Sequence, residues 1–529
     1  MKFKLLTTFM FFLIASIPIL QASHASTPLV VQTPTIKGEG VFYEIFVRSF
    51  ADSNGDGIGD LKGITEKLDY LNDGNPKTNT DLGVTGIWLM PIFKSPSYHG
   101  YDTTDYYAIN PNYGTIDDLK KLVKAAHKRG IKVILDIAIN HSSDEHTWFN
   151  QAKDATSNYH NWYVWAEDQG LDTQTEGAFS QNVFYESNGN HYLAIFWNKM
   201  PDFNFDNKQV RNEFVNIGKY WLRIGVDGFR LDAAKHVYEN FASDHGKKAV
   251  IAKNVAWWQE FRKGLSQINK NVYLISEIWD SPHVISPHLN KTFNASFNFD
   301  LQKKIIGISN SETSEALGQY LNPIYSSYLR DAKGPVSDGT FIGNHDMDRP
   351  MSQLRRGINP SKTAIAMLLT LPGTPYIYYG DEIGMFGHKP DELIREPFLW
   401  YKNGADGKWK TRWESSNVNT NNPPSVEAQK NDPTSLLSLY RNLIHLRLRE
   451  PLLQNGALED YKVSNRSIQA YTRFTKKDRL LVLINLSANT QSVTINDHFS
   501  KLLISTDSLN KWSGTLISLR PYSTVVLKQ

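Results

Sequence analysis

Short apolar runs alternate with helical patterns from about residue 40 to residue 379. The runs are rich in β-branched and aromatic residues, whereas stretches such as 116–129, 212–224 and 256–268 carry apolar residues at helical spacing. Strand–helix repetition of this kind predicts a parallel sheet with helical crossovers. Eight repeats favour a closed (β/α)8 barrel over a doubly wound sheet. The expected strands are residues 41–48, 86–90, 133–137, 228–231, 272–275, 297–299, 340–343 and 376–379.

Two regions depart from this repeat. Residues 142–204 are rich in Asn, Asp, Trp and Tyr and show little helical periodicity, which indicates a subdomain inserted after the third strand. Beyond a polar stretch (404–433) and an expected helix (436–449), the pattern changes to alternation of apolar and polar residues, typical of antiparallel strands. We expect these strands at 467–474, 479–486, 491–495 and 516–528, in a C-terminal β-sandwich. The predicted organisation is a barrel of residues 26–141 and 205–450, the insertion 142–204, and a C-terminal domain 451–529.

The first 25 residues have the composition of a secretory signal peptide. Lys2 and Lys4 precede an apolar run over residues 5–20, and the small residues of a cleavage site follow at Ser23 and Ala25. The alternative is a membrane anchor, but the run is shorter than the roughly 20 residues that span a bilayer. We therefore expect a secreted, extracellular protein with no membrane association after the signal is removed.

Composition narrows the class further. The chain of 529 residues is 40% hydrophobic and 12% aromatic, which supports large cores and excludes global disorder. Its 57 basic and 54 acidic residues form no long run of one sign, so nucleic acid is not an expected partner. The chain has no cysteine, which excludes disulfides, thiolate metal sites and cysteine nucleophiles. We expect a monomer.

Acids and histidines gather where the predicted strands end. In a parallel barrel the active residues lie at the carboxyl ends of the strands, and any one such acid is more often a solvated loop residue. Here, however, four successive clusters each combine an acid with His, Arg or Trp, which makes that explanation unlikely for the set. The clusters lie in residues 136–141, 228–236, 275–280 and 341–349.

Two of these acids suit different chemical roles. Arg230 and Asp232 lie two residues apart and so share one face of a strand, where a guanidinium can keep the carboxylate ionised as a nucleophile. Glu277 follows an apolar run, and burial there would raise its pKa until it donates a proton near neutrality. This division of roles is that of retaining glycoside hydrolysis. Asp346, with His345 beside it, would bind sugar hydroxyls in the distorted state.

Together these motifs resemble the α-amylase family, glycoside hydrolase family 13. The signatures Asp-x-x-x-Asn-His, Gly-Phe-Arg-x-Asp, Glu-x-Trp and Asn-His-Asp occur in family order, and residues 373–385 resemble the eighth-strand segment. The resemblance implies Asp232 as nucleophile, Glu277 as acid/base and Asp346 as transition-state stabiliser. It also implies an α-glucan substrate such as starch or maltooligosaccharides. The implied substrate contacts are Tyr101, as a stacking platform, together with His141, Arg230 and His345, with Asp136 as a structural acid.

Two further features indicate which members of the family the sequence resembles most. Lys235 and His236 resemble the α-amylase form, in which this pair lies toward the leaving-group side, and this favours internal cleavage of α-1,4-glucan. Residues 200–204, Met-Pro-Asp-Phe-Asn, instead resemble a group between the oligo-1,6-glucosidases and the neopullulanases, whose members also transfer glucosyl units. The alternatives are therefore an exo-acting α-glucosidase, an oligo-1,6-glucosidase or a cyclomaltodextrinase-like enzyme. A non-catalytic glucan-binding protein is disfavoured because all three carboxylates are present.

A loop near the N-terminus suits calcium. It resembles an EF-hand loop with side-chain oxygens at positions 1, 3, 5 and 9, Gly57 at position 6 and a backbone carbonyl at position 7, although position 12 is Gly63 in place of Glu. The alternative is an Asx- and Gly-rich turn. The resemblance to oligo-1,6-glucosidase-like members favours Ca2+, and it implies a possible second site at Asn140 and the His236 carbonyl. The expected ligands of the first site are Asp52, Asn54, Asp56, Ile58 and Asp60.

Overall fold

The computed structural model describes residues 33–355, 357–402, 405–415, 418–419 and 424–529. The chain divides into two units, Met1–Thr33 and Pro34–Gln529, and every element described here belongs to the second. The expected signal peptide, residues 1–25, lies outside the described residues. Within the described part, no helix combines the length and the apolar character needed to cross a bilayer.

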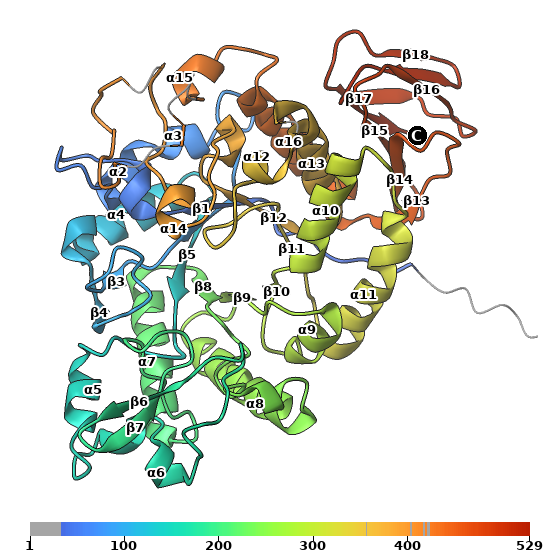
Figure 1. The fold of residues 1–529 in the computed structure, drawn as a ribbon. Helices are drawn as coiled ribbons and strands as arrows, with labels where there is room; N and C mark the ends of the chain where they lie inside the picture. Colours follow the sequence, from blue (N-terminus) through green and yellow to red (C-terminus); the bar gives the residue numbers. More distant parts are fainter. Residues whose placement is uncertain (1–32, 356, 403–404, 416–417, 420–423) are drawn as a thin grey trace, which may run out of the picture. The chain divides into compact units, whose positions relative to one another are not determined.

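Eight parallel strands form the barrel (Figure 1). Their order in the sheet is β10-β9-β8-β5-β2-β1-β12-β11, and a parallel bridge between Phe297 and Gly339 joins the two ends into a closed cylinder. Their inward side chains, among them Phe42, Trp88 and Tyr273, make a buried aromatic cluster inside the barrel. The strands are β1 (Phe42–Ile45), β2 (Gly86–Leu89), β5 (Lys132–Ile137), β8 (Gly228–Leu231), β9 (Tyr273–Ser276), β10 (Ala295–Ser296), β11 (Gly339–Thr340) and β12 (Thr374–Tyr378).

The expected (β/α)8 barrel is thus confirmed, but several strand bounds are wrong. The seventh strand, expected at 340–343, is β11 and ends at Thr340. Residues 46–48 leave the first strand, because Val47–Phe50 form the short helix α1. The sixth strand ends before Phe297, and Phe299 begins helix α10 (Phe299–Ser311). The reason is local: the Asn298 side chain accepts a hydrogen bond from Leu301 N and so caps this helix, whereas the alternating phenylalanines resemble a strand.

Helices cover the outside of the barrel, and the four expected from their apolar spacing are present. These are α4 (Ile116–His127), α7 (Lys208–Ile224), α8 (Lys248–Leu265) and α16 (Leu436–Arg449). Thr115 and Asp118 form a capping box that starts α4. The remaining helices of the barrel and its loops are α2 (Leu61–Glu66), α3 (Leu68–Leu71), α9 (Pro282–His288), α11 (Leu317–Ala332), α12 (Pro350–Gln353), α13 (Ile358–Thr370), α14 (Asp391–Ile394), α15 (Val426–Gln429) and α17 (Pro451–Asn455).

The insertion follows β5, the third barrel strand in sequence, and has a small core of its own. Its hairpin of β6 (Phe184–Ser187) and β7 (Asn190–Leu193) lies with the short helices α5 (Thr147–Ala152) and α6 (Ala166–Gln169). Val164, Val183 and Leu193 are buried in its apolar cluster. A second hairpin, β3 (Phe93–Lys94) with β4 (Asp105–Ile109), extends the loop after β2. Both segments project from the carboxyl ends of barrel strands, where they can line an active site.

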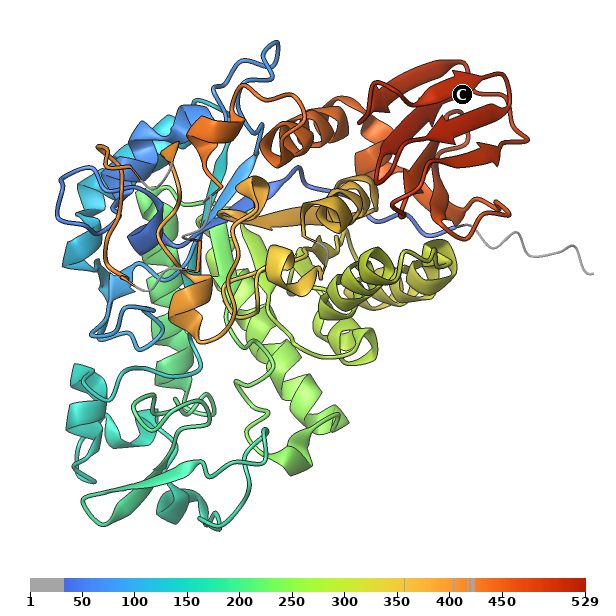
Figure 2. The ribbon, with the colours of Figure 1, turned by 45° about the horizontal axis from the view of Figure 1, so that its top comes forward.

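The C-terminal part is a sandwich of two antiparallel sheets (Figure 2). The expected strand at 516–528 is two strands, because Pro521 and Tyr522 (φ +53°) form a turn between them. Both faces of the larger sheet are buried: Leu481 faces the smaller sheet, whereas Val482 packs in the main core. The strands are β13 (Ala457–Asp460), β14 (Ile468–Phe474), β15 (Arg479–Asn485), β20 (Thr524–Lys528) and β17 (Lys501–Ser505) in one sheet, and β16 (Gln491–Thr494), β19 (Leu516–Leu519) and β18 (Lys511–Ser513) in the other.

Candidate active site

The strand ends bring the predicted acids together around one arginine. Arg230 lies in β8 with less than 2% of its surface exposed, and its Nη1 donates to Asp136 Oδ1 at 2.8 Å and to Asp232 Oδ1 at 2.6 Å. Its Nη2 lies 2.7 Å from Glu277 Oε2. Asp232 and Glu277 come from neighbouring strands, β8 and β9, so their carboxylates converge because a single guanidinium holds both. Both also border open space, since Asp232 is partly exposed and Glu277 retains 9% of its surface.

Burial and neighbouring charges separate these two acids. Burial raises the pKa of Glu277 to about 7; Arg230 opposes this rise, whereas Asp232 and Asp346 add to it. Near neutral pH, Glu277 therefore exists in both its protonated and its ionised form, as a general acid and base requires. Burial also raises the pKa of Asp232, while the ion pair with Arg230 favours its charged form.

Asp346 lies between two cationic side chains, His345 and Arg395. Its Oδ2 is 2.9 Å from His345 Nε2, and its Oδ1 is 3.0 Å from Arg395 Nη2. Although burial acts in the other direction, the charge of His345 lowers the pKa of Asp346 well below its usual range, and Arg395 adds to the effect. Burial would lower the pKa of His345, but Asp346 and Glu44 raise it to about 10. Asp346 is thus a fixed negative charge beside a cationic imidazole.

Sequence reasoning missed two members of this arrangement. Glu44 is buried in β1 with its Oε1 2.5 Å from His345 Nδ1, and Arg395 donates from Nε to the His345 carbonyl at 2.9 Å. A signal for Glu44 existed, since a lone acid in the apolar strand Phe-Tyr-Glu-Ile needs a buried partner. Arg395 has no such signal, because it lies far along the chain in a loop after α14.

Tyr101 lies beside His345 and Asp136 at the strand ends. Its ring stacks on His345 with centroids 5.6 Å apart and planes 16° apart, and its hydroxyl donates to Asp136 Oδ2 at 3.0 Å. The ring is only partly buried. A fixed, half-exposed aromatic face beside the catalytic acids suits the apolar face of a pyranose.

His141 is a buried side chain with unused hydrogen-bonding capacity. Both of its ring nitrogens are buried, and among the described residues neither makes a hydrogen bond of good geometry, although the Tyr101 backbone lies close enough to act on the ring. Burial lowers the pKa of His141 to about 4, so the ring is neutral at pH 7 and offers one donor and one acceptor. Buried polar atoms without partners are rare in folded proteins, and a sugar hydroxyl would satisfy this one.

Lys235 and His236 lie at the site but are already engaged. The Lys235 ammonium is buried, 2.8 Å from Asp280 Oδ2 and 2.9 Å from Glu239 Oε1. His236 Nδ1 hydrogen-bonds the Glu239 carbonyl at 2.8 Å. These contacts position the loop after β8 and engage the Lys235 ammonium in two ion pairs. The expected contact of Lys235 with glucan stays a prediction.

Exposed aromatic rings surround these groups. Phe196 lies 5.4 Å from His141 and 5.7 Å from His236 between ring centroids, and Phe179 lies 5.2 Å from His236. Trp279, two residues after Glu277, is 47% exposed and stacks on Phe299 at 4.4 Å. Apolar rings that remain exposed beside polar groups fit a ligand that combines hydroxyls with C–H faces.

The loop from Asp52 to Asp60 has the donor chemistry that calcium prefers. Asp52 and Asp60 are buried, and Gly57 has the positive φ (+91°) that a tight ligand loop needs. Their carboxylates accept backbone N–H groups: Asp52 accepts from Gly57 N at 2.8 Å, and Asp60 from Ser53 N at 2.8 Å. Asp52 Oδ1 accepts two backbone N–H groups, whereas Asp52 Oδ2 and both Asp60 oxygens accept one each and keep a lone pair that a hard cation could use.

Elsewhere, the possible metal ligands are divided. At the possible second site, Asn140 Nδ2 donates to Asp202 Oδ1 at 2.9 Å, and the His236 ring hydrogen-bonds the Glu239 carbonyl. A calcium ion bound by Asn140 and the His236 carbonyl stays a prediction. Among the described residues, one group of three acid or imidazole side chains has ligand atoms within 4.8 Å of one another, namely Glu239, His245 and Asp280. The Lys235 ammonium contacts both acids of this group and balances their charge.

Two carboxyl groups that converge at the strand ends of a closed parallel barrel fit a glycosidase. Comparison with known families agrees. Residues 44–456 match the family model described as alpha amylase, catalytic domain, and residues 468–526 match the one described as alpha-amylase SusG C-terminal domain. The chain therefore belongs to the alpha-amylase family of hydrolases, glycoside hydrolase family 13.

Similar proteins extend over nearly the whole chain. It is 39% identical over 490 residues to alpha-amylase 3 of Dictyoglomus thermophilum, covering 92% of this chain and 93% of that protein. The crystal structure of alpha-amylase from H. orenii is 42% identical with a TM-score of 0.84, covering 94% of this chain and all of that one. The 4-alpha-glucanotransferase of Thermotoga maritima is 34% identical over 454 residues, which is 84% of this chain and 95% of that protein.

Proposed function

We propose that the protein is a secreted α-amylase that hydrolyses internal α-1,4-glucosidic bonds of starch and maltooligosaccharides with retention of configuration. The observation that carries the proposal is the shared contact of Asp232 and Glu277 with Arg230, which brings two carboxyl groups close together. We assign Asp232 as the nucleophile and Glu277 as the acid. Retaining glycosidases need two carboxyl groups only about 5 Å apart, so that both reach one anomeric centre. The proposal of secretion rests on the composition of residues 1–25.

In the first half-reaction Asp232 attacks the anomeric carbon. The bond from that carbon to the glycosidic oxygen breaks, and Glu277 transfers its proton to the departing oxygen. A pKa of about 7 for Glu277 makes the protonated form abundant at mildly acidic and neutral pH. The ionised Asp346 lies beside the site with its charge fixed by His345 and Arg395, and it stabilises the cationic character of the transition state.

In the second half-reaction a water molecule replaces the leaving group. Glu277, now ionised, takes a proton from the water, whose oxygen attacks the anomeric carbon and releases Asp232. His141 would bind a hydroxyl of the glucosyl unit through its ring nitrogens, while Tyr101 packs against the sugar face. Two inversions at one carbon leave the α configuration unchanged.

Calcium is the proposed cofactor. Asp52, Asn54, Asp56, Asp60 and the Ile58 carbonyl would hold it in the loop that leads into α2. Bound there, the ion would neutralise the loop carboxylates and so stabilise the fold. The loop residues take no part in the bond cleavage described above.

Transfer of the glucosyl unit to a second sugar is the alternative outcome. Transfer differs from hydrolysis only in that a sugar hydroxyl, and not water, attacks the intermediate. The similarity of this chain to a 4-alpha-glucanotransferase supports transfer as the alternative. The exposed Trp279 lies close to the acid Glu277 in sequence and would offer an acceptor sugar a stacking surface. Exo-cleavage, by contrast, would require a pocket closed at one end.

A time course on a linear maltooligosaccharide labelled at its reducing end tests these alternatives. Internal cleavage produces several labelled lengths from the earliest times, whereas removal of terminal units shortens the substrate one glucose at a time. Products longer than the substrate would reveal transfer. An exclusive early release of glucose would refute the endo-acting proposal.

A further inference from the structure

A second cavity, away from the catalytic residues, contains a buried arginine without an ion partner. Arg441, on the first half of α16, is 8% exposed, and its Nη1 donates to the Lys430 carbonyl at 3.1 Å. Its Nε is buried and has no hydrogen-bond partner in the part of the chain that the structure describes. Among the residues that the structure describes, no carboxylate oxygen lies within 4.0 Å of the guanidinium nitrogens of Arg441. A buried charge without a counter-ion is costly.

The nearest acids are committed to other groups. Asp81 accepts from His445 Nε2 at 3.0 Å and from Asp73 N at 3.0 Å. Glu382 accepts two tyrosine hydroxyls, each at 2.6 Å. Burial lowers the pKa of Arg441, and Tyr70, Asp81 and Glu382 only partly offset this effect. Among the described residues, the Lys430 carbonyl is the one hydrogen-bond acceptor of this guanidinium.

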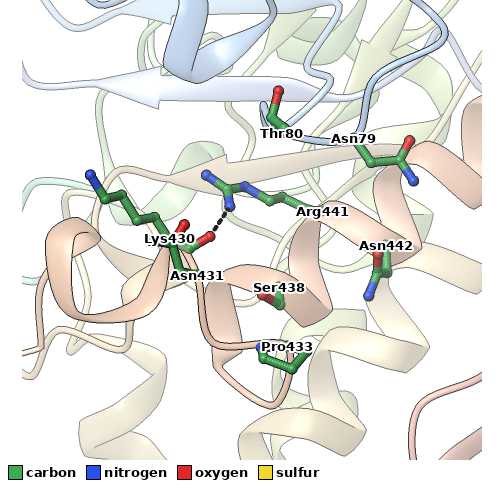
Figure 3. A pocket seen from close by; sticks show the side chains of 8 residues that line it. All are labelled: Asn79, Thr80, Lys430, Asn431, Pro433, Ser438, Arg441 and Asn442. Atoms are coloured by element: carbon green, nitrogen blue, oxygen red, sulfur yellow. Dashed lines mark hydrogen bonds between the residues drawn. The ribbon is translucent and has the colours of Figure 1, made fainter.

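The cavity beside Arg441 has a volume of about 430 Å³ and is lined by hydrogen-bond donors (Figure 3). Among the described residues, no acidic side chain and no aromatic ring lines it, and Lys430 adds a second positive charge. Asp432, the next acid along the chain, accepts from Thr434 N and Oγ1. The lining residues are Asn79, Thr80, Lys430, Asn431, Pro433, Ser438, Arg441 and Asn442.

We propose that this cavity binds a tetrahedral oxyanion, either free phosphate or sulfate or the phosphate group of a phosphorylated sugar. A guanidinium presents its N–H groups as a planar fork that matches two oxygens of such an anion. Lys430 supplies further charge, and the amides of Asn79, Asn431 and Asn442 supply neutral donors around it. The absence of aromatic residues from the lining argues against a neutral glucan, which would need a ring to stack on.

The position of the cavity separates it from catalysis. Asn79 and Thr80 belong to the loop between α3 and β2, which leads into the amino end of a barrel strand, whereas the catalytic acids follow the carboxyl ends. The anion would join this loop to α16 and stabilise the folded enzyme without touching the glucan. The inference does not depend on the proposed substrate specificity.

The test uses the full-length enzyme in chloride buffer at constant ionic strength. Inorganic phosphate should raise the melting temperature progressively with concentration, as expected for a ligand that binds only the folded state. Titration calorimetry should give a one-to-one complex, and Arg441→Gln should weaken it at least tenfold while starch hydrolysis without phosphate stays unchanged. Lys430→Ala should weaken it less, because Lys430 is exposed. The same rise in Arg441→Gln as in the wild type would overturn the proposal.

Two further arms identify the source of the anion and guard against misfolding. Glucose 6-phosphate that binds more tightly than inorganic phosphate would support the ester, and equal or weaker binding would support the free anion. Unphosphorylated glucose must not compete. If Arg441→Gln does not fold, the double variant Lys430→Ala/Asn442→Ala takes its place, with an expected loss of at least tenfold. No binding of either phosphate by the wild-type enzyme would refute the inference.

Discussion

Replacing Glu277 by Gln should abolish activity and at the same time stabilise the folded enzyme, in a manner that depends on pH. Burial raises the pKa of Glu277 from its ordinary 4.5 to about 7. The folded state therefore holds a proton that the unfolded chain releases between these two values, so stability falls as the pH rises through this window. At ~1.4 kcal/mol per pH unit, the shift corresponds to roughly 3 kcal/mol above pH 7.

The amide cannot ionise, so the Gln variant avoids this cost. Its carbonyl oxygen can still accept the hydrogen bond from Ala233 N that Glu277 Oε2 accepts at 3.1 Å. We expect the variant to melt above the wild type at pH 8 and close to it at pH 4.5. Activity should fall by ~10²–10⁴-fold, since the proton donor is lost.

Thermal melting at both pH values, paired with a starch assay, measures this prediction. Glu66→Gln is the matched control with the opposite sign: hydrogen bonds from Lys408 and Trp409 lower the pKa of Glu66 below 4.5. Its loss should therefore destabilise the protein at pH 8 and at pH 4.5 alike, and the effect should fade only as the pH falls further through the lowered pKa. A difference between wild type and Glu277→Gln that is the same at both pH values, or a variant that melts lower at pH 8, would refute the reasoning about burial.

The remaining predictions concern the rest of the site and the loop. The kcat/KM of the wild type should decline on the basic side with an apparent pKa near 7, since loss of the Glu277 proton removes the acid; a profile flat to pH 9 would contradict this. Asp232→Asn should lose at least 10³-fold in kcat with near-UV circular dichroism unchanged, and retention of most activity would exclude it as nucleophile. Arg395→Met should reduce kcat by ~10- to 100-fold, because Asp346 loses one of its two cations; an unchanged kcat would show that His345 alone suffices. Chelation should lower the melting temperature of the wild type but not that of Asp52→Asn, and equal shifts in both would place the calcium elsewhere.

Local patterns in the sequence were sufficient to predict the barrel and the principal acids. Alternation of apolar strands with helical spacing depends on neighbouring residues, and so does the common face of Arg230 and Asp232, which a strand enforces at a spacing of two. The rule that parallel strands present their carboxyl ends at one face then places Asp136, Glu277 and Asp346 near them. These conclusions require only the hydrophobic period, the order of the strands and helices, and the residue types.

Only the tertiary structure decided how these groups act on one another. The pKa of Glu277 reflects burial and charges from three different strands and loops, and Arg395 reaches Asp346 from a distant loop. The ion pairs of Lys235 with two acids from separate loops are likewise a result of the tertiary structure. So is the packing of the larger C-terminal sheet, whose two faces lie in separate cores. Electrostatic interaction and packing depend on distance in space, and a linear pattern does not encode that distance.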